Sequence, residues 1–347
     1  MYAREFRDGA KDGLEALEPL DPDKITSFSG LLEAMGKTAF GGRHLGHAFD
    51  VLWEMIEDPD CHVVMTLSGA MTIAKMGKII TRMIDEGMVQ CIISTGALMA
   101  HGLTESVGKT HYRHDPAMSD EELFRKGYNR VYDTLEMESN LNYVEHVVAQ
   151  TLKRLNQDQP LSSAILTREI GKTLAEEIDS DGILKSAYLK KVPVYIPAFT
   201  DSEVGLDMGT WAMAREVDRA RAQVEPGRDL DILRAIQQSC PLFNPYLDLN
   251  SYADHVLSAK RLGIFTIGGG VPRNWAQQVG PYIEISNLRL GLNVKPPRFH
   301  YGVRICPEPD YWGGLSGCTY QEGLSWGKFV TPKDGGRFAE VLSDATV

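Results

Sequence analysis

Four short apolar runs, each ending in a turn of small residues, constrain the fold of this chain more than any other feature. They cover residues 62–67, 89–94, 192–199 and 262–267. None shows strict alternation of apolar and polar residues, and such runs are typical of strands buried on both faces of a parallel sheet. Segments with apolar residues three or four positions apart lie between them and predict helices. We therefore expect an α/β fold, with a Rossmann-like parallel sheet flanked by helices.

The turns that follow these runs carry the residue types of a nucleotide site. In an open parallel sheet, ligands bind beyond the carboxyl ends of the strands. Glycine and serine there let backbone N–H groups approach a phosphate, and a hydroxyl or carboxylate can hold a ribose. One such turn is ordinary, but four in one chain favour a nucleotide site. The turns contain Ser68 and Gly69, Thr95 and Gly96, Thr200 and Asp201, and Gly268, Gly269 and Gly270.

The organisation of the chain favours a single large domain. No internal repeat or Pro/Ser-rich linker divides it, and we expect a domain over residues 26–347 after an N-terminal extension, residues 1–25, rich in Asp and Glu. Residues 293–314 are rich in Pro, Gly and aromatic side chains. We expect them to form a long ordered loop, and loops of that length usually carry function.

Charge and cysteine usage exclude several classes of protein. The formal net charge of −11 argues against a surface for nucleic acid or anionic lipid, because phosphates require a basic face. No run of 18 apolar residues predicts a membrane span, and the first twenty residues have no apolar core of a signal peptide. The five cysteines form no C-x-x-C pair, which favours reduced thiols. We expect a cytoplasmic protein.

Several familiar motifs fail when their spacing is tested. The tripeptide GKT occurs three times, but no copy has the glycine that a P-loop requires five positions earlier. The triple glycine is not a full dinucleotide fingerprint, because Arg273 occupies the position of the last glycine. The pairs His44/His47 and His111/His114 have ligand spacing but no evident third ligand, so we expect hydrogen-bonded histidines and no metal site.

The segment YQEGLSWGKFV, residues 320–330, contains the most unusual lysine of the chain. Lys328 follows Trp326 and Gly327, with Glu322 six residues before it. This lysine is either an ordinary surface residue at the start of a strand or a group for amine chemistry. Partial burial would lower its pKa and free its lone pair to attack an imine carbon, and an indole face attracts a cationic substrate.

Nearly the whole chain resembles the deoxyhypusine synthase family, including its bacterial deoxyhypusine synthase-like members. The likeness is carried by KTAFGGRHLG (37–46), TLSGA (66–70), STGA (94–97), YNRVYDTLEME (128–138), PAFTD (197–201), FTIGGGV (265–271) and EGLSWGK (322–328). The last segment is the most specific, because its lysine matches the one on which the family forms a covalent imine.

The resemblance implies NAD-dependent transfer of a 4-aminobutyl group from a polyamine such as spermidine. In the family, NAD takes a hydride from the carbon beside the secondary amine, and 1,3-diaminopropane is displaced. The group forms an imine on the lysine and passes to an acceptor amine, and the retained NADH returns the hydride. The resemblance also implies a homotetramer with active sites between two subunits.

The resemblance also assigns roles to residues of this chain. Lys328 would be the covalent relay, Trp326 would pack on the substrate chain and Glu322 would hold an ammonium group. NAD would contact Ser68, Gly69, Thr95, Gly96, Asp201, Gly268, Gly269 and Gly270.

Five positions depart from the family pattern. Ala100 and His101 replace an acidic pair, Asn274 replaces a histidine that carries a proton, Leu315 replaces an acidic residue, and a carboxylate is displaced by one position to Asp207. Leucine in place of a carboxylate would leave a desolvated ammonium group unpaired and weaken its binding by several kcal/mol. Either the substrate differs, therefore, or His101, Glu203 or Asp207 binds it instead. We expect a small amine as acceptor; the alternatives are a protein lysine, a non-catalytic NAD-binding paralogue and an ordinary nicotinamide dehydrogenase.

Overall fold

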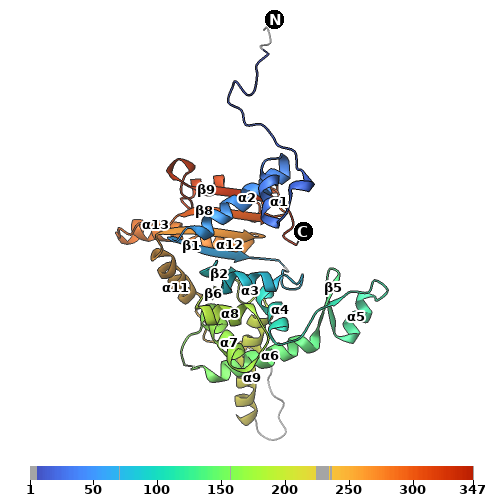
Figure 1. The fold of residues 1–347 in the computed structure, drawn as a ribbon. Helices are drawn as coiled ribbons and strands as arrows, with labels where there is room; N and C mark the ends of the chain where they lie inside the picture. The colour runs from blue at the N-terminus through green and yellow to red at the C-terminus, as the bar shows by residue number, and fades with distance from the viewer. Residues whose placement is uncertain (1–5, 70, 157, 224–233, 235–236, 347) are drawn as a thin grey trace.

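A six-stranded parallel sheet forms the centre of the protein (Figure 1). The structure is a computed structural model, and it describes residues 6–69, 71–156, 158–223, 234 and 237–346. The strand order is β6-β2-β1-β7-β8-β9. The strands are β1 (Cys61–Leu67), β2 (Cys91–Ser94), β6 (Val194–Tyr195), β7 (Arg261–Ile267), β8 (Phe299–Cys306) and β9 (Arg337–Leu342). The expected α/β fold, a Rossmann-like parallel sheet flanked by helices, is confirmed.

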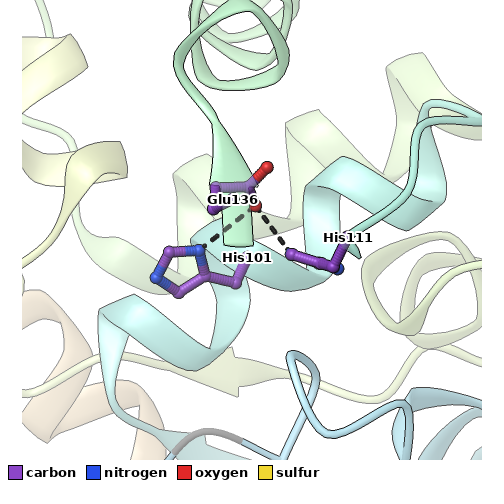
Figure 2. Close-up of side chains that lie close together, drawn as sticks. All are labelled: His101, His111 and Glu136. Atoms are coloured by element: carbon purple, nitrogen blue, oxygen red, sulfur yellow. Dashed lines mark hydrogen bonds and ion pairs between the residues drawn. The ribbon is translucent and has the colours of Figure 1, made fainter. Parts of the chain in front are cut away.

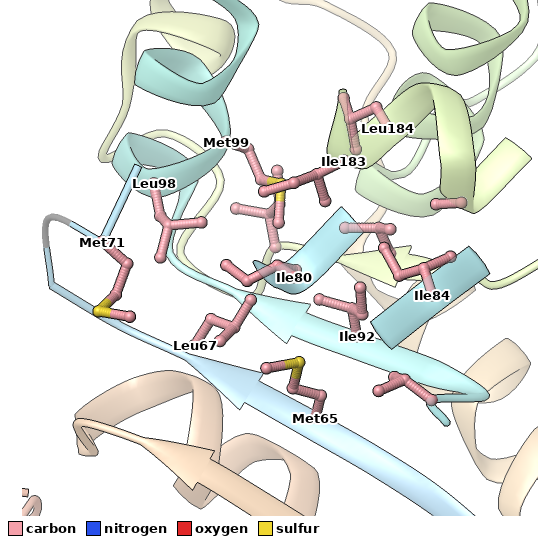
Figure 3. Packing of buried hydrophobic residues seen from close by; sticks show 14 of the residues in the cluster. Met65, Leu67, Met71, Ile80, Ile84, Ile92, Leu98, Met99, Ile183 and Leu184 are labelled. Carbon is pink, nitrogen blue, oxygen red and sulfur yellow. The ribbon is translucent and has the colours of Figure 1, made fainter. Parts of the chain in front are cut away.

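One face of the sheet carries the larger hydrophobic core. Successive side chains of a strand point to opposite faces, and β1 directs Met65 and Leu67 into this core. Figure 3 shows them packed with Ile80 and Ile92. The helices that contribute to it are α2 (Phe40–Glu57), α3 (Gly77–Asp85), α4 (Gly96–Ser106), α6 (Glu138–Arg154), α7 (Ser163–Glu177), α8 (Ile183–Lys190) and α9 (Glu203–Gln223).

The opposite face carries a smaller and more aromatic core. Val64 of β1 points into it, together with Tyr252, Tyr320 and Phe329. The helices on this face are α11 (Pro245–Leu257), α12 (Gly270–Gln277), α13 (Val279–Leu290) and α14 (Tyr320–Ser325). The two faces therefore bury different sets of helices, which matters for the placement of the site residues.

A small antiparallel sheet and one short helix project from the body of the protein (Figure 1). The elements are β3 (Tyr112–Arg113), α5 (Asp120–Lys126), β4 (Tyr128–Val131) and β5 (Thr134–Met137). Ser119 caps the start of α5, and Gly127 ends it in the left-handed conformation. β5 leads directly into α6, so its side chains are held against the helical layer.

The N-terminal part of the described chain runs away from the body before the first helix (Figure 1). Glu18 anchors it, because its carboxylate lies 3.3 Å from the ammonium group of Lys37 and its N–H donates to the carbonyl of Lys37. A short 3-10 helix, η1 (Pro22–Lys24), precedes α1 (Phe28–Gly36), and η2 (Asp310–Trp312) and η3 (Pro332–Asp334) lie near the other end. The boundary at residue 25 stays a prediction.

The expectation of a long loop over residues 293–314 is wrong, because β8 occupies its centre. This strand contains His300 and Arg304, which interrupt the apolar run that predicts a buried strand. Arg304 is tolerated there because its register partner on β9, Glu340, accepts a hydrogen bond from it at 2.5 Å. An ion pair between β8 and β9 therefore occupies positions where a buried strand usually has apolar residues.

The third predicted strand, residues 192–199, is much shorter in the structure. Only Val194–Tyr195 pairs with β2, and prolines 193 and 197 flank it. Proline cannot donate to a strand ladder and is confined to sheet edges, where β6 lies. Asp201 therefore lies at the start of α9 and not directly at a strand end. No helix in the described part of the chain is long and apolar enough to cross a membrane.

The crossing of α1 and α2 gives a test of the packing. A Cβ on Gly46 would collide with the backbone of Gly36 and approach the carbonyl oxygen of Leu32 to 2.6 Å. We expect Gly46→Ala to lower the free energy of unfolding by about 1–3 kcal/mol, measured by urea denaturation. Gly41→Ala on the same helix is the matched control, because nothing lies within 4 Å of its added Cβ. Equal stability of the two variants would contradict this packing.

Candidate functional site

A cavity of about 780 Å³ lies beyond the carboxyl ends of β1, β7 and β8. Its floor contains Ser68, Gly69, Gly268 and Gly269, which follow two adjacent strands. The opposite wall comes from residues 131–134, the turn between β4 and β5. This volume lies within the range of sites that bind cofactors. Four of the eight residues predicted to contact a cofactor therefore line one cavity.

The backbone at this edge is shaped by Ser68. Its hydroxyl accepts a hydrogen bond from the N–H of Gly269 at 2.8 Å and lies 3.0 Å from the carbonyl of the same residue. Gly268 has a φ of +80°, a conformation that side chains disfavour. A Cβ on Gly269 would lie 2.6 Å from the Cα of Ser316. The glycines allow this close approach of two loops, and the cavity depends on it.

The other four predicted cofactor residues lie outside the lining of this cavity. The hydroxyl of Thr95, at the start of α4, is buried and has no hydrogen-bond partner among the described residues. Gly96 packs against Ser202, and Asp201 is exposed. Gly270 begins α12 with a φ of +64°. The cavity, its open glycine floor and the unpartnered hydroxyl fit a dinucleotide bound at the sheet edge.

A second cavity, of about 350 Å³, contains Lys328. The lysine is only 7% exposed, although α14 ends three residues before it. Gly327, with a φ of +67°, turns the chain, and the N–H of Phe299 then donates to the carbonyl of Lys328 at 3.0 Å. The ammonium group donates to the amide oxygen of Asn274 at 3.2 Å. The fold therefore buries this lysine and points it at α12.

The electrostatics of Lys328 suit a nucleophile. Burial lowers its pKa most, and the guanidinium of Arg273 lowers it further, whereas Cys318 and Glu322 act in the opposite direction. A lowered pKa increases the fraction of uncharged amine, which is the form that attacks a carbon atom. The ring centroid of Trp326 lies 6.0 Å from the Nζ atom, and this indole is 62% exposed.

Two carboxylates line the lysine cavity, and the sequence predicts only one of them. Glu322 was expected there, and the structure adds Asp310. Leu315, at the position where the family pattern has an acidic residue, also lines the cavity and is 47% exposed. Asp310 lies five residues before Leu315, and this separation in the sequence does not indicate that the two residues line the same cavity. The cavity can therefore hold a cationic chain.

Asp207 lies in a different group of acidic residues, on α9. Burial raises its pKa to about 7, and the charges of Glu145 and Glu203 add to the effect. Glu145, on α6, was not predicted from the sequence. Because burial and negative neighbours both disfavour the charged form, a bound cation would relieve the repulsion.

The third group surrounds the carboxylate of Glu136 on β5. Figure 2 shows His101 and His111 directed at it, with a 3.4 Å contact to Nδ1 of His101 and a 2.6 Å contact to Nε2 of His111. Thr104 and Asn140 also donate to this carboxylate. Burial acts to raise the pKa of Glu136, but its contacts with His101, His111 and Asn140 hold that pKa well below its usual range. The sequence pairs His111 with His114, but the fold pairs it with Glu136.

His101, His111 and Glu136 have the composition of a metal site, but their surroundings fit a hydrogen-bonded cluster better. The ammonium group of Lys75 lies 3.2 Å from Nδ1 of His111. It makes Nδ1 an acceptor, so the ring hydrogen is on Nε2, the atom that lies 2.6 Å from the Glu136 carboxylate. A metal-bound histidine has the reverse arrangement, because its outer nitrogen donates to an acceptor.

The chain places these groups on opposite faces of its sheet. Lys328, Trp326 and Glu322 lie with α12 and α14, on the side of the smaller core. His101 and Asp207 lie on α4 and α9, which pack into the larger core. Within one chain, the predicted site residues therefore form two sets and not one cluster.

Comparison with known proteins gives a consistent result along the chain. The profile of the deoxyhypusine synthase family matches residues 30–347. A "Probable deoxyhypusine synthase 2" of Methanosarcina acetivorans is 32% identical over 95% of this chain and 86% of that protein. A "Deoxyhypusine synthase-like protein" of Elusimicrobium minutum is 29% identical over 94% of this chain and 80% of that protein. The fold resembles a "putative deoxyhypusine synthase" of Entamoeba histolytica, with a TM-score of 0.57 and 12% identity over 95% and 93% of the chains.

The position of Asp207 predicts a pH-dependent stability. Its pKa is raised from 3.8 to about 7, so the folded protein keeps a proton that the unfolded chain releases. The carboxyl group therefore lowers the free energy of unfolding as the pH rises from 4 to 7. We expect Asp207→Asn to raise the melting temperature by a few degrees at pH 8 and by less at pH 5.

The matched control for this experiment is Asp218→Asn, an exposed aspartate on the same helix. Its melting temperature relative to the wild type should not change between pH 5 and pH 8. A gain in Asp207→Asn that is independent of pH would contradict the acidic environment described for this residue.

Proposed function

The chain belongs to the deoxyhypusine synthase family, and from this premise we propose that it transfers a 4-aminobutyl group from a polyamine such as spermidine to an acceptor amine, through an imine on Lys328 and with NAD as cofactor. The observation that carries the proposal is the buried lysine in a cavity with two carboxylates. A reactive amine must be uncharged part of the time, and a polyamine needs anionic partners. The burial of Lys328 and the two carboxylates of the same cavity support the proposal on both counts.

The residues of this chain would have distinct tasks. Lys328 would attack the oxidised carbon and carry the aminobutyl group, while Asp310 and Glu322 would bind an ammonium end of the substrate. Trp326 would pack on the methylene chain and attract its positive charge. NAD, when bound, would accept a hydride from the substrate carbon and later return it. Ser68, Gly69, Gly268 and Gly269 would hold it in the larger cavity, with Thr95 nearby on the sheet edge.

We propose a small amine, and not a protein lysine, as the acceptor. The lysine cavity of about 350 Å³ is lined by Leu315 at a position where the family pattern has an anchoring acid. The loss of that charge and the added carboxylate of Asp310 change where an amine can bind. A free diamine can adapt its position in such a cavity more easily than a lysine fixed in a folded protein can.

We further propose that the active site is completed by a second copy, within a homotetramer. The separation of the lysine set from His101 and Asp207 supports this arrangement. Trp326 lines the lysine cavity, Tyr311 and Trp312 follow Asp310 of its lining, and all three are exposed; such an apolar surface usually contacts another chain. We also propose a cytoplasmic location, which the five free cysteines support.

The proposal predicts a covalent adduct on one lysine. Purified protein incubated with NAD and spermidine and then reduced with borohydride should carry the aminobutyl group on Lys328, detected by peptide mass spectrometry. The adduct should be absent without NAD. Lys328→Ala should lose the adduct and the transfer but still bind NAD in calorimetry, because the lysine lines a different cavity.

The matched control is Lys333→Ala, an exposed lysine five residues further along. This variant should form as much adduct as the wild type. Absence of any adduct with all polyamines tested, despite bound NAD, would refute the transferase function and favour a non-catalytic NAD-binding protein. Steady accumulation of NADH would instead indicate a dehydrogenase.

A further inference from the structure

We infer that His101 is the proton carrier of the transfer reaction and that Glu136 is the positioning residue that holds it. The inference rests on the proposed function, because it concerns a step of that reaction. It assigns a purpose to a buried cluster that the lysine cavity and the dinucleotide cavity leave unexplained (Figure 2).

The first step of the reaction requires a base. A secondary amine of a polyamine is protonated at neutral pH, and its nitrogen must lose that proton before a hydride can leave the neighbouring carbon. When the base takes this proton, the N–H bond breaks and leaves its electron pair on the nitrogen. That lone pair would form the C=N bond while the electron pair of the neighbouring C–H bond leaves as hydride to NAD. In total, one proton passes to the base, and one hydride, with its two electrons, would pass to NAD.

The lysine cavity does not supply a suitable base among its described residues. Asn274, which contacts Lys328, has an amide nitrogen without a basic lone pair. Asp310 and Glu322 are carboxylates, which the proposed function uses to bind the ammonium end of the substrate. An imidazole is closer to the working pH and is the usual group for this task. The base must therefore come from another part of the composite site.

Glu136 fixes the orientation of the His101 ring. Because the carboxylate is charged and only accepts hydrogen bonds, the Nδ1 atom that lies 3.4 Å from it carries the ring hydrogen. The other nitrogen, Nε2, then has a free lone pair. Figure 2 shows that this nitrogen points away from Glu136. The same logic orients the histidine of a catalytic triad.

Glu136 is itself held on both oxygens. One accepts from Thr104 at 2.9 Å and lies 2.6 Å from Nε2 of His111, and the other accepts from Asn140 and from the N–H of Met137, both at 3.0 Å. This side chain is 1% exposed. Such a carboxylate neither moves nor takes up a proton easily, as a positioning group requires.

His101 is the more accessible histidine of the cluster. The His111 side chain is fully buried, whereas that of His101 is 16% exposed. His101 also lies on α4, which begins at the carboxyl end of β2 with Thr95 as its cap. The helix therefore connects the proposed cofactor edge with the histidine.

The charged groups around His101 are few and come from defined elements. Glu136 and His111 face the ring directly, and Lys75 and Glu105 form an ion pair behind His111. Helix α8 presents the apolar Ile183 to α4. The remaining charges lie on α6 and α9, which pack against α4: Glu145, Glu203 and Asp207.

The decisive experiment is chemical rescue in a single turnover. With NAD and spermidine, His101→Ala should form NADH about 10²–10⁴-fold more slowly than the wild type and should bind NAD equally well. Added imidazole should restore much of the rate, because a small base can replace the missing side chain. His114→Ala, a histidine outside the cluster, is the control and should react normally.

The positioning role has a readout that needs no turnover. In ¹⁵N NMR spectra, His101 of the wild type should show the tautomer with hydrogen on Nδ1, and Glu136→Gln should mix the two tautomers. If the wild type forms NADH but His101→Ala reacts as fast, or imidazole does not rescue it, the inference fails while the proposed function stands. A wild type that forms no NADH refutes the proposed function instead. Stoichiometric Zn²⁺ binding that Glu136→Gln abolishes would also overturn the inference, because the cluster would then be a metal site.

Discussion

The pairing of β1 with β7 is the interaction on which the proposed cofactor site depends. The two strands run in parallel register from Cys61 opposite Arg261 to Leu67 opposite Ile267, so they end at the same level. The two turns that follow meet directly, and the hydroxyl of Ser68 joins them through Gly269. A shift of one residue would exchange the two faces of β1 and separate these turns. The cavity at the sheet edge is thus a result of strand register and not of any loop by itself.

Burial acts on three charged groups of this chain with different results. Burial lowers the pKa of Lys328, and the guanidinium of Arg273 adds to the effect. Asp207 keeps a proton because its neighbours are also acidic. Glu136 stays ionised because His101, Thr104, Asn140 and the N–H of Met137 donate to it. Desolvation disfavours the charged form of all three groups, and their different partners decide the direction in which each pKa moves.

The sequence predicted what depends on local pattern and missed what depends on distant contacts. β1, β2 and β7 were found because they are continuous apolar runs, and the segment around Lys328 was found because tryptophan, glycine and lysine are rarely combined in this way. β8 was missed because Arg304 is neutralised by Glu340, 36 residues away. Glu136 was missed for the same reason: its donors come from α4, α6 and the loop after α4, and no spacing in the sequence indicates that they meet. Likewise, nothing in the sequence indicates that Lys328 and Asp207 lie on opposite faces of the sheet.

Because one chain keeps Lys328 and Asp207 on opposite faces of its sheet, a site that needs both would draw them from two copies. In an assembly of two different mutant chains, the substituted residues would then be distributed unevenly between the sites. A pair made of one chain without the lysine and one without the aspartate would lose both residues at one site and keep both at the other. Two individually inactive alleles would therefore complement each other in the same cell, and a single defective allele would never silence every site of a mixed assembly.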